Sequence, residues 1–153
     1  MKKLLFIIPA LFLFSCGTDD VDVSPTAVQI NALTVLNYPM LMESGTVWDF
    51  ALLFEEDENP DPFFSILSGS NPVYTSGEYY NASGGALSFS ELNIELNASS
   101  QYVFGLYDWD IDGIHETMGE FYFNPYSYSD GTPATKVLSS GNLTVEFSLS
   151  YIY

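Results

Sequence analysis

Four acidic residues lie close together in the segment YVFGLYDWDIDGIHETMGEFYF, residues 102–123. Asp108, Asp110, Asp112 and Glu116 separate two apolar runs that are typical of β-strands. Residues i and i+2 of a strand point to the same face, so Asp108 and Asp110 are expected to project together. Carboxylates this close repel by about 1 kcal/mol per pair in water, and a divalent cation would neutralise them. Since Ca²⁺ takes about six to eight oxygen ligands in flexible geometry, the loop predicts a calcium site; the alternative is a solvated acidic hairpin.

The same loop resembles the first half of an EF-hand over residues 108–113. Position 12 of that motif requires glutamate but falls on Gly119, and position 8 falls on His115 instead of an aliphatic residue. The flanking segments are also strand-like and not helical. We therefore reject the EF-hand, although both interpretations predict calcium.

The first 15 residues have the layout of a secretory signal peptide. Two lysines precede an apolar core of residues 4–14, which is too short to span a hydrocarbon layer of roughly 30 Å. The following Leu-Phe-Ser-Cys resembles the lipobox of bacterial lipoproteins, in which the cysteine, here Cys16, is lipidated. Residues 1–15 are therefore predicted to be a lipoprotein signal peptide.

The residues after Cys16 bear on the location of the protein. Gly17, in place of aspartate, disfavours retention in the inner membrane, and the acidic run at residues 19–22 resembles a surface-export signal of lipoproteins. We expect a lipoprotein anchored by Cys16 in the outer membrane and exposed at the cell surface. Residues 16–26 would form the lipidated cysteine and a flexible acidic tether, and residues 27–153 one domain.

The composition restricts the possible partners and activities. Without the signal peptide, Lys136 is the only basic residue against 20 acidic ones, so nucleic acid is excluded as a partner. At 47% hydrophobic and 16% aromatic residues, the chain can form a packed core. The single cysteine is expected to be lipidated, and the single histidine, His115, is not expected to act as a catalytic base or metal ligand, so no enzyme is predicted. His115 is expected in a solvated loop tip.

Short strand-like runs separated by turn residues predict an all-β fold, an eight-stranded antiparallel β-sandwich. The alternation of apolar and polar residues is clearest in the last run, LTVEFSLSYIY. The predicted strands are residues 27–38, 47–54, 63–67, 73–80, 86–96, 101–107, 120–123 and 143–153.

Several of these features together resemble the C2 domain, a β-sandwich family that binds calcium and membrane or protein partners. Asp108-Trp109-Asp110, followed by Glu116, is similar to the third calcium loop of that family. Glu43 and Asp49 have the six-residue spacing of the two acidic ligands in its first loop. The family usually has Asp-Pro-Tyr at the second of these ligands, where this chain has Asp-Phe-Ala.

Two further segments extend the resemblance to residues 27–153. Asn-Pro-Val-Tyr at residues 71–74 is similar to a turn between the calcium loops, and the glycine-led run at 141–151 is similar to the terminal strand. This order implies the circularly permuted, type II topology. Because the chain has no lysine-rich strand, we do not transfer the family's basic lipid site to it.

The resemblance implies a C2-like module whose two acidic loops bind Ca²⁺ and so control contact with an unidentified protein or membrane partner. The implied metal ligands are Glu43, Asp49, Asp108, Asp110 and Glu116. Apolar residues at the loop tips are candidates for contact with the partner: Met40, Leu41, Met42, Ile111 and Ile114. The alternative hypothesis is a metal-independent adhesive or accessory lipoprotein, in which the acidic loops only maintain solubility.

Overall fold

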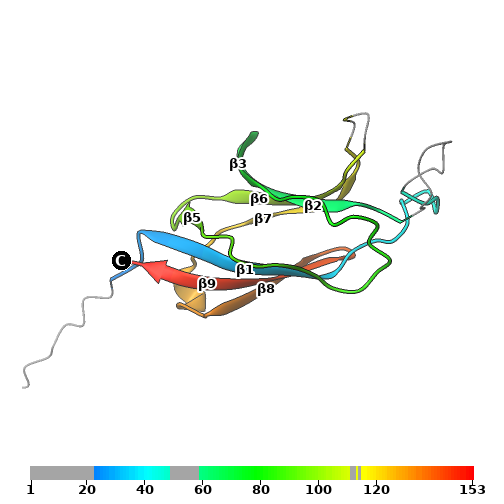
Figure 1. Cartoon of the computed structure of the whole chain (residues 1–153). Helices are drawn as coiled ribbons and strands as arrows, with labels where there is room; N and C mark the ends of the chain where they lie inside the picture. Colours follow the sequence, from blue (N-terminus) through cyan, green and yellow to red (C-terminus); the bar gives the residue numbers. More distant parts are fainter. Residues whose placement is uncertain (1–22, 49–58, 111–112, 114) are drawn as a thin grey trace, which may run out of the picture.

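Two antiparallel sheets lie face to face in this protein (Figure 1). The computed structural model describes residues 23–48, 59–110, 113 and 115–153. Its strands are β1 (Ala27–Asn37), β2 (Pro62–Ser68), β3 (Asn71–Thr75), β4 (Leu87–Phe89), β5 (Ile94–Asn97), β6 (Tyr102–Asp108), β7 (Thr117–Phe123), β8 (Thr135–Ser140) and β9 (Leu143–Ile152). A 3₁₀ turn, η1 (Tyr128–Asp130), precedes β8. One sheet has the order β4-β1-β9-β8, with β5 also paired to β1, and the other has the order β3-β2-β6-β7. The predicted antiparallel β-sandwich is confirmed.

Aromatic side chains join the two sheets in the core. Phe104 of β6 is fully buried and stacks on Phe64 of β2, with 5.6 Å between ring centroids. It also meets Phe147 of β9, in the opposite sheet, edge-on at 5.9 Å. Burying one such ring contributes roughly 1.5–3 kcal/mol, so these contacts hold the sheets together as one core.

The register of the second sheet places the acidic segment at one end of the sandwich. Phe63 pairs with Tyr107 and Pro62 with Asp108, so β6 ends where β2 begins. Phe64 and Phe104 are buried between the sheets, and the alternation of strands directs Phe63 and Tyr107 to the outer face. The end of β6 thus has an aromatic outer side and an acidic inner side.

Three of the predicted strands differ in the structure. Val47 and Trp48 are not in a strand, and the rest of the run at 47–54 lies outside the described residues. The strand predicted at 73–80 ends at Thr75. The run at 86–96 is divided into β4 and β5, because Glu91 and Asn93 between them have positive φ angles of 58° and 51°.

Two local predictions were wrong. Residues 71–74 were expected in a turn between the calcium loops, but Asn71 begins β3 and pairs with Ser68 of β2. The strand β8 was not predicted, and it raises the number of strands in the described part of the chain to nine. Ser140 pairs with Leu143, so a two-residue turn joins β8 to β9, and Gly141 has the positive φ of 57° that such turns favour.

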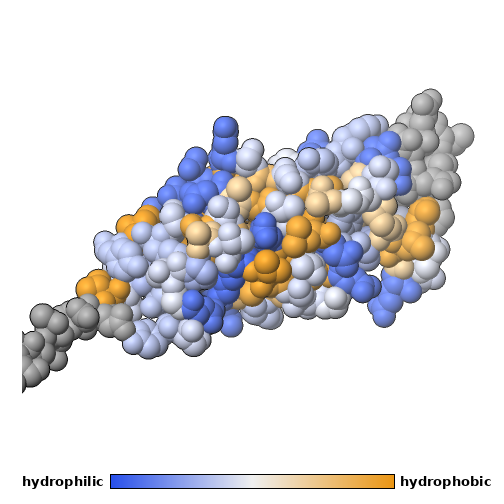
Figure 2. Space-filling model, turned by 90° about the horizontal axis from the view of Figure 1, so that it is seen from below, coloured by the Kyte–Doolittle hydropathy of each residue, from blue (hydrophilic) through white to orange (hydrophobic). Residues whose placement is uncertain are grey.

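The outer surface of the first sheet mixes polar and apolar residues. Seen from below, hydrophobic residues gather in patches, with hydrophilic residues between and around them (Figure 2). Val137, which is exposed, pairs with Glu146 of the neighbouring strand. No helix in the described segments is long and apolar enough to cross a membrane.

Candidate functional site

Three neighbouring strands bring acidic residues together at one end of the second sheet. Asp61 immediately precedes β2, Asp108 is the last residue of β6, and Glu116 immediately precedes β7. The backbone N–H of Asp108 donates to the carbonyl of Glu116 at 2.9 Å, and that of Trp109 donates to the carbonyl of Asp61 at 3.2 Å. We call Asp61, Asp108, Asp110 and Glu116 the acidic cluster.

Asp108 is the buried centre of the cluster. Its Oδ1 accepts the backbone N–H of Asp61 at 2.7 Å, and the residue has no exposed surface. The pKa of the Asp108 carboxyl is raised to about 6, chiefly by burial; the Asp61 N–H lowers it in part, and the charges of Asp61 and Glu116 act in the same direction as burial. The strand places a side chain here that is costly to ionise without a cation.

Two oxygens of the cluster are buried and lack a hydrogen-bond partner within the described part of the chain. They are Oδ2 of Asp108 and Oε2 of Glu116. A buried carboxylate oxygen without a donor loses its hydration and gains nothing in return. Both oxygens are hard ligands of the kind that Ca²⁺ prefers.

The loop between β6 and β7 also holds Asp110. The backbone N–H of Asp110 donates to Nδ1 of His115 at 3.3 Å, and its carbonyl accepts the N–H of Gly113 at 3.0 Å. Asp110 is half-buried, and His115 is exposed. His115 thus shapes the loop backbone that carries Asp110.

The structure brings some of the predicted ligands together and not others. Asp108 and Glu116 are in electrostatic contact, with Asp110 in the same loop. Glu43 is exposed in a turn closed by the hydrogen bond from the Met42 N–H to the Thr46 carbonyl, and within the described residues the structure does not bring it to the cluster. Asp49 lies outside the described residues.

Asp61 was not predicted, although the sequence contained a signal for it. Asp61-Pro62-Phe63 matches the Asp-Pro-aromatic pattern of the first calcium loop better than the segment that begins at Asp49. The Asp61 carboxylate accepts the backbone N–H of Asn81, which fixes its position. Asp61 therefore belongs in the candidate ligand set.

Of the apolar loop-tip residues predicted to contact a partner, some pack inward, one is exposed and others lie outside the described residues. Met40 and Met42 pack against the core, whereas Leu41 is exposed. Ile111 and Ile114 lie outside the described residues, as does Cys16.

The site contains acidic ligands but not a complete metal cage. Among residues 23–48, 59–110, 113 and 115–153, no group of three or more His, Cys, Asp or Glu side chains is arranged to hold a metal ion. The connection between β1 and β2 adds five acidic residues outside the described segments: Asp49, Glu55, Glu56, Asp57 and Glu58.

Comparison with solved structures identifies the architecture. The protein superimposes on a solved C2 domain with a TM-score of 0.53 at 10% identity, over 83% of this chain and 98% of that chain. The fold is C2-like. Because the identity is so low, this similarity concerns the fold alone.

Two further solved structures match less well. A pair of C2 domains from extended synaptotagmin 2 gives a TM-score of 0.48 at 10% identity, over 95% of this chain and 46% of that chain. A single C2 domain from plant extended synaptotagmin 1 gives 0.44 at 15% identity, over 85% and 97%. No protein-family model matches the sequence, and no curated protein matches it.

Proposed function

We propose that this protein is a C2-like module that binds Ca²⁺ through its acidic cluster and thereby controls contact with a protein or membrane partner. We further propose that Cys16 anchors it as a lipoprotein in the outer membrane, at the cell surface. The observation that carries the calcium proposal is the buried carboxylate of Asp108, whose Oδ2 lacks a donor in the described residues while two further carboxylates act on it.

The chemistry of the cluster fits a calcium ion. Asp61, Asp108, Asp110 and Glu116 would supply oxygens from the second sheet, and Glu43 and Asp49 remain predicted ligands from the β1–β2 connection. Bound Ca²⁺ would supply positive charge that neutralises these side chains. The residues themselves position the site, since the bond from the Asp61 N–H to Oδ1 of Asp108 joins the start of β2 to the end of β6.

The carboxylates of the cluster repel one another when they are ionised. Asp61 and Glu116 each raise the pKa of Asp108, which is the signature of mutual repulsion. Neutralising that repulsion would favour a single arrangement of the loops and a less negative end of the sandwich. A partner excluded by the negative charge could then approach.

Thermal unfolding in EDTA and in calcium tests this proposal. A ligand that binds only the native state at 100 times its Kd stabilises it by about 2.7 kcal/mol. We expect a rise in Tm at millimolar Ca²⁺, because extracellular modules bind at about 10⁻⁴–10⁻³ M. Magnesium should not reproduce it, since Mg²⁺ requires a more rigid octahedral geometry.

Variants make the test specific to the cluster. Asp108→Asn/Asp110→Asn should abolish the calcium-dependent rise in Tm. Glu95→Gln, which removes one exposed carboxylate from β5 in the other sheet, should retain it. No shift in the wild type up to about 10 mM, ten times the weak end of that range, would contradict the proposal.

A second candidate function is metal-independent adhesion. It is favoured by the absence of three converging metal-binding side chains among the described residues. The sandwich would then bind its partner equally well in EDTA and in calcium.

A further inference from the structure

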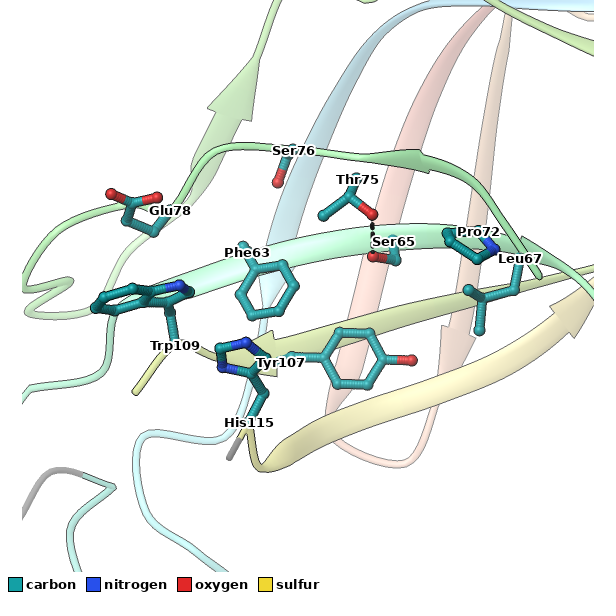
Figure 3. Close-up of a pocket in the computed structure, with 10 residues that line it drawn as sticks. All are labelled: Phe63, Ser65, Leu67, Pro72, Thr75, Ser76, Glu78, Tyr107, Trp109 and His115. Atoms are coloured by element: carbon teal, nitrogen blue, oxygen red, sulfur yellow. Dashed lines mark hydrogen bonds between the residues drawn. The ribbon is translucent and has the colours of Figure 1, made fainter. Parts of the chain in front are cut away.

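A trough lies on the outer face of the second sheet, next to the acidic cluster but lined by different residues. Its volume is about 550 Å³, within the range of roughly 300–1,000 Å³ found for small-molecule sites. Phe63, Ser65 and Leu67 of β2 line its floor, as the alternation of the strand requires (Figure 3). The trough therefore belongs to the surface of the sheet and not to the core.

One end of the trough is built from aromatic rings. His115 meets Phe63 edge-on, with 5.0 Å between centroids and an interplanar angle of 77°, and lies beside Trp109 at 6.2 Å and 30°. Tyr107 lies at 5.5 Å and 30° from Phe63. Trp109 remains 39% exposed, so part of its ring surface is available to a ligand.

The charges around this aromatic end are negative. Glu78 lines the trough near Trp109 (Figure 3), and the charge of Glu120 contributes to the raised pKa of Tyr107, after the larger effect of burial. Among the residues that the structure describes, no lysine or arginine lines the trough. Lys136, the one basic residue outside the signal peptide, pairs with Asp130 at 2.9 Å. An anionic ligand would be repelled here, and a cation would meet both a carboxylate and aromatic faces.

The opposite end of the trough is apolar. Leu67 and Pro72 lie there, beyond Ser65 and Thr75, whose hydroxyl groups are bonded to each other at 2.8 Å (Figure 3). This hydrogen bond satisfies part of the bonding capacity of the two hydroxyls. An aliphatic chain running from the aromatic end would bury its methylene groups against Leu67 and Pro72.

We propose that the trough binds an organic cation, an ammonium or guanidinium group carried on an aliphatic stem. The cation lies over the ring of Trp109 within reach of Glu78, and the stem extends towards Leu67 and Pro72. Such a group belongs either to a free alkylamine or to a basic side chain of a protein, and both present the same chemistry. None of these residues is a proposed calcium ligand, but Trp109 and His115 lie in the loop that carries Asp110, so the binding is tested both without and with calcium.

The test is an NMR titration that follows the indole N–H of Trp109, assigned with Trp109→Phe. The probes are butylguanidinium and its neutral isostere butylurea, each added to the purified protein in EDTA and again in calcium. We expect saturable shifts with butylguanidinium and at least about tenfold weaker binding of butylurea, equivalent to about 1.4 kcal/mol. Equal affinity for the two probes, or no saturable shift with either, would overturn the proposal.

Two variants separate local binding from the general negative charge of the protein. Glu78→Gln should weaken butylguanidinium binding several-fold, whereas Glu95→Gln, an equal change of charge on β5 in the other sheet, should not. An equal loss in both variants would overturn the proposal, since it would reduce the effect to net charge. The failure of calcium to change Tm would leave this result untouched.

A final arm identifies the source of the cation. Spermidine and the capped peptide acetyl-Gly-Arg-Gly-amide are titrated in the same way. Tighter binding of spermidine supports a free amine, and tighter binding of the peptide supports a protein side chain. Failure of both to compete with butylguanidinium would overturn the assignment of the cation to a free amine or a protein side chain.

Discussion

The carboxyl group of Asp108 is placed where its charge is most costly. It is the last residue of β6 on the side that faces the core, and it has no exposed surface. Burial is the largest cause of its raised pKa, and the charges of Asp61 and Glu116 act in the same direction. A residue that lowers the stability of the cation-free fold in this way is expected where a positive ligand binds.

The raised pKa of Asp108 predicts an unusual dependence of stability on pH. Between the ordinary value of 3.8 and about 6, the folded protein retains a proton that the unfolded chain has lost. The contribution of Asp108 to the free energy of unfolding is therefore present at low pH and decreases as the pH rises through this window. Asp108→Asn should remove this contribution and be more stable than the wild type at pH 7.5 in EDTA.

Urea unfolding at a series of pH values, compared between wild type and Asp108→Asn, measures this contribution. Glu95→Gln serves as the control for the loss of one negative charge. In calcium the order should reverse above pH 6, because the ionised carboxylate is the form that binds a metal. Parallel curves for wild type and Asp108→Asn between pH 4 and 7 would contradict the assignment.

At the residue scale, the sequence predicted the second-sheet part of the cluster because its spacing follows strand geometry. Asp108 and Asp110 are two residues apart at the end of β6, and Glu116 immediately precedes the next strand, β7. The first-loop assignment rested on the six-residue spacing of Glu43 and Asp49 and on the apolar run that follows them in the sequence. Asp61 joins the cluster through a pairing between distant segments, since β2 and β6 are adjacent only in the folded sheet.

At the element scale, the outer face of β6 is shaped by a close approach between Gly105 and Tyr107. The Tyr107 ring lies back over Gly105, so that a Cβ added to the glycine would overlap the phenol oxygen and ring carbons. Residues 105 and 107 share the outer face of the strand. Glycine at this position allows the tyrosine to lie flat in the wall of the trough.

We predict that Gly105→Ala lowers the free energy of unfolding by about 1–3 kcal/mol, as overpacking does. Tyr107→Ser in the same chain should recover part of this loss, with a coupling of about 0.5–3 kcal/mol between the two sites. Urea unfolding of the two single variants and the double variant measures that coupling. Gly77→Ala is the matched control, because its Cβ would meet nothing within 4 Å and its φ is not positive. Additive effects of the two substitutions would contradict the predicted contact.

The elements that the sequence predicted well are those with long, regular alternation. β1 and β9 pair over most of their lengths and are buried on one face, which is the pattern that an amphipathic strand must have. β8 was missed because it has only two apolar residues, Val137 and Leu138. It forms a strand by pairing with β9, which its own sequence does not indicate. The division of residues 86–96 depends on backbone angles at Glu91 and Asn93 that hydrophobic periodicity does not report.

At the scale of the whole molecule, the chain enters the sandwich at the end opposite the acidic cluster. β1 begins at Ala27, beside the C-terminal end of β9, and its 11 residues run towards the end where β2 begins and β6 ends (Figure 1). A strand of that length spans about 36 Å. If Cys16 is the anchor, residues 16–26 could extend about as far as the domain is long, so the tether alone does not fix its orientation. The negative charge of the cluster repels anionic headgroups and favours an orientation in which it points away from the anchoring membrane.

This orientation predicts that the proposed calcium loops act on a partner other than the membrane that holds the anchor. The fluorescence of both tryptophans reports on the orientation of the domain. Trp109 follows β6, and Trp48 lies between β1 and β2, where its indole N–H donates to the Pro39 carbonyl at 2.9 Å. With the lipidated protein on vesicles that contain brominated lipids, we expect their fluorescence to remain unquenched, in EDTA and in calcium. Cys16→Ser should not co-float with the vesicles, which controls for the anchor. Calcium-dependent quenching would place the loop end in the anchoring bilayer and contradict an outward-facing site, whereas unquenched fluorescence with a calcium-dependent Tm would direct the search to partners beyond that membrane.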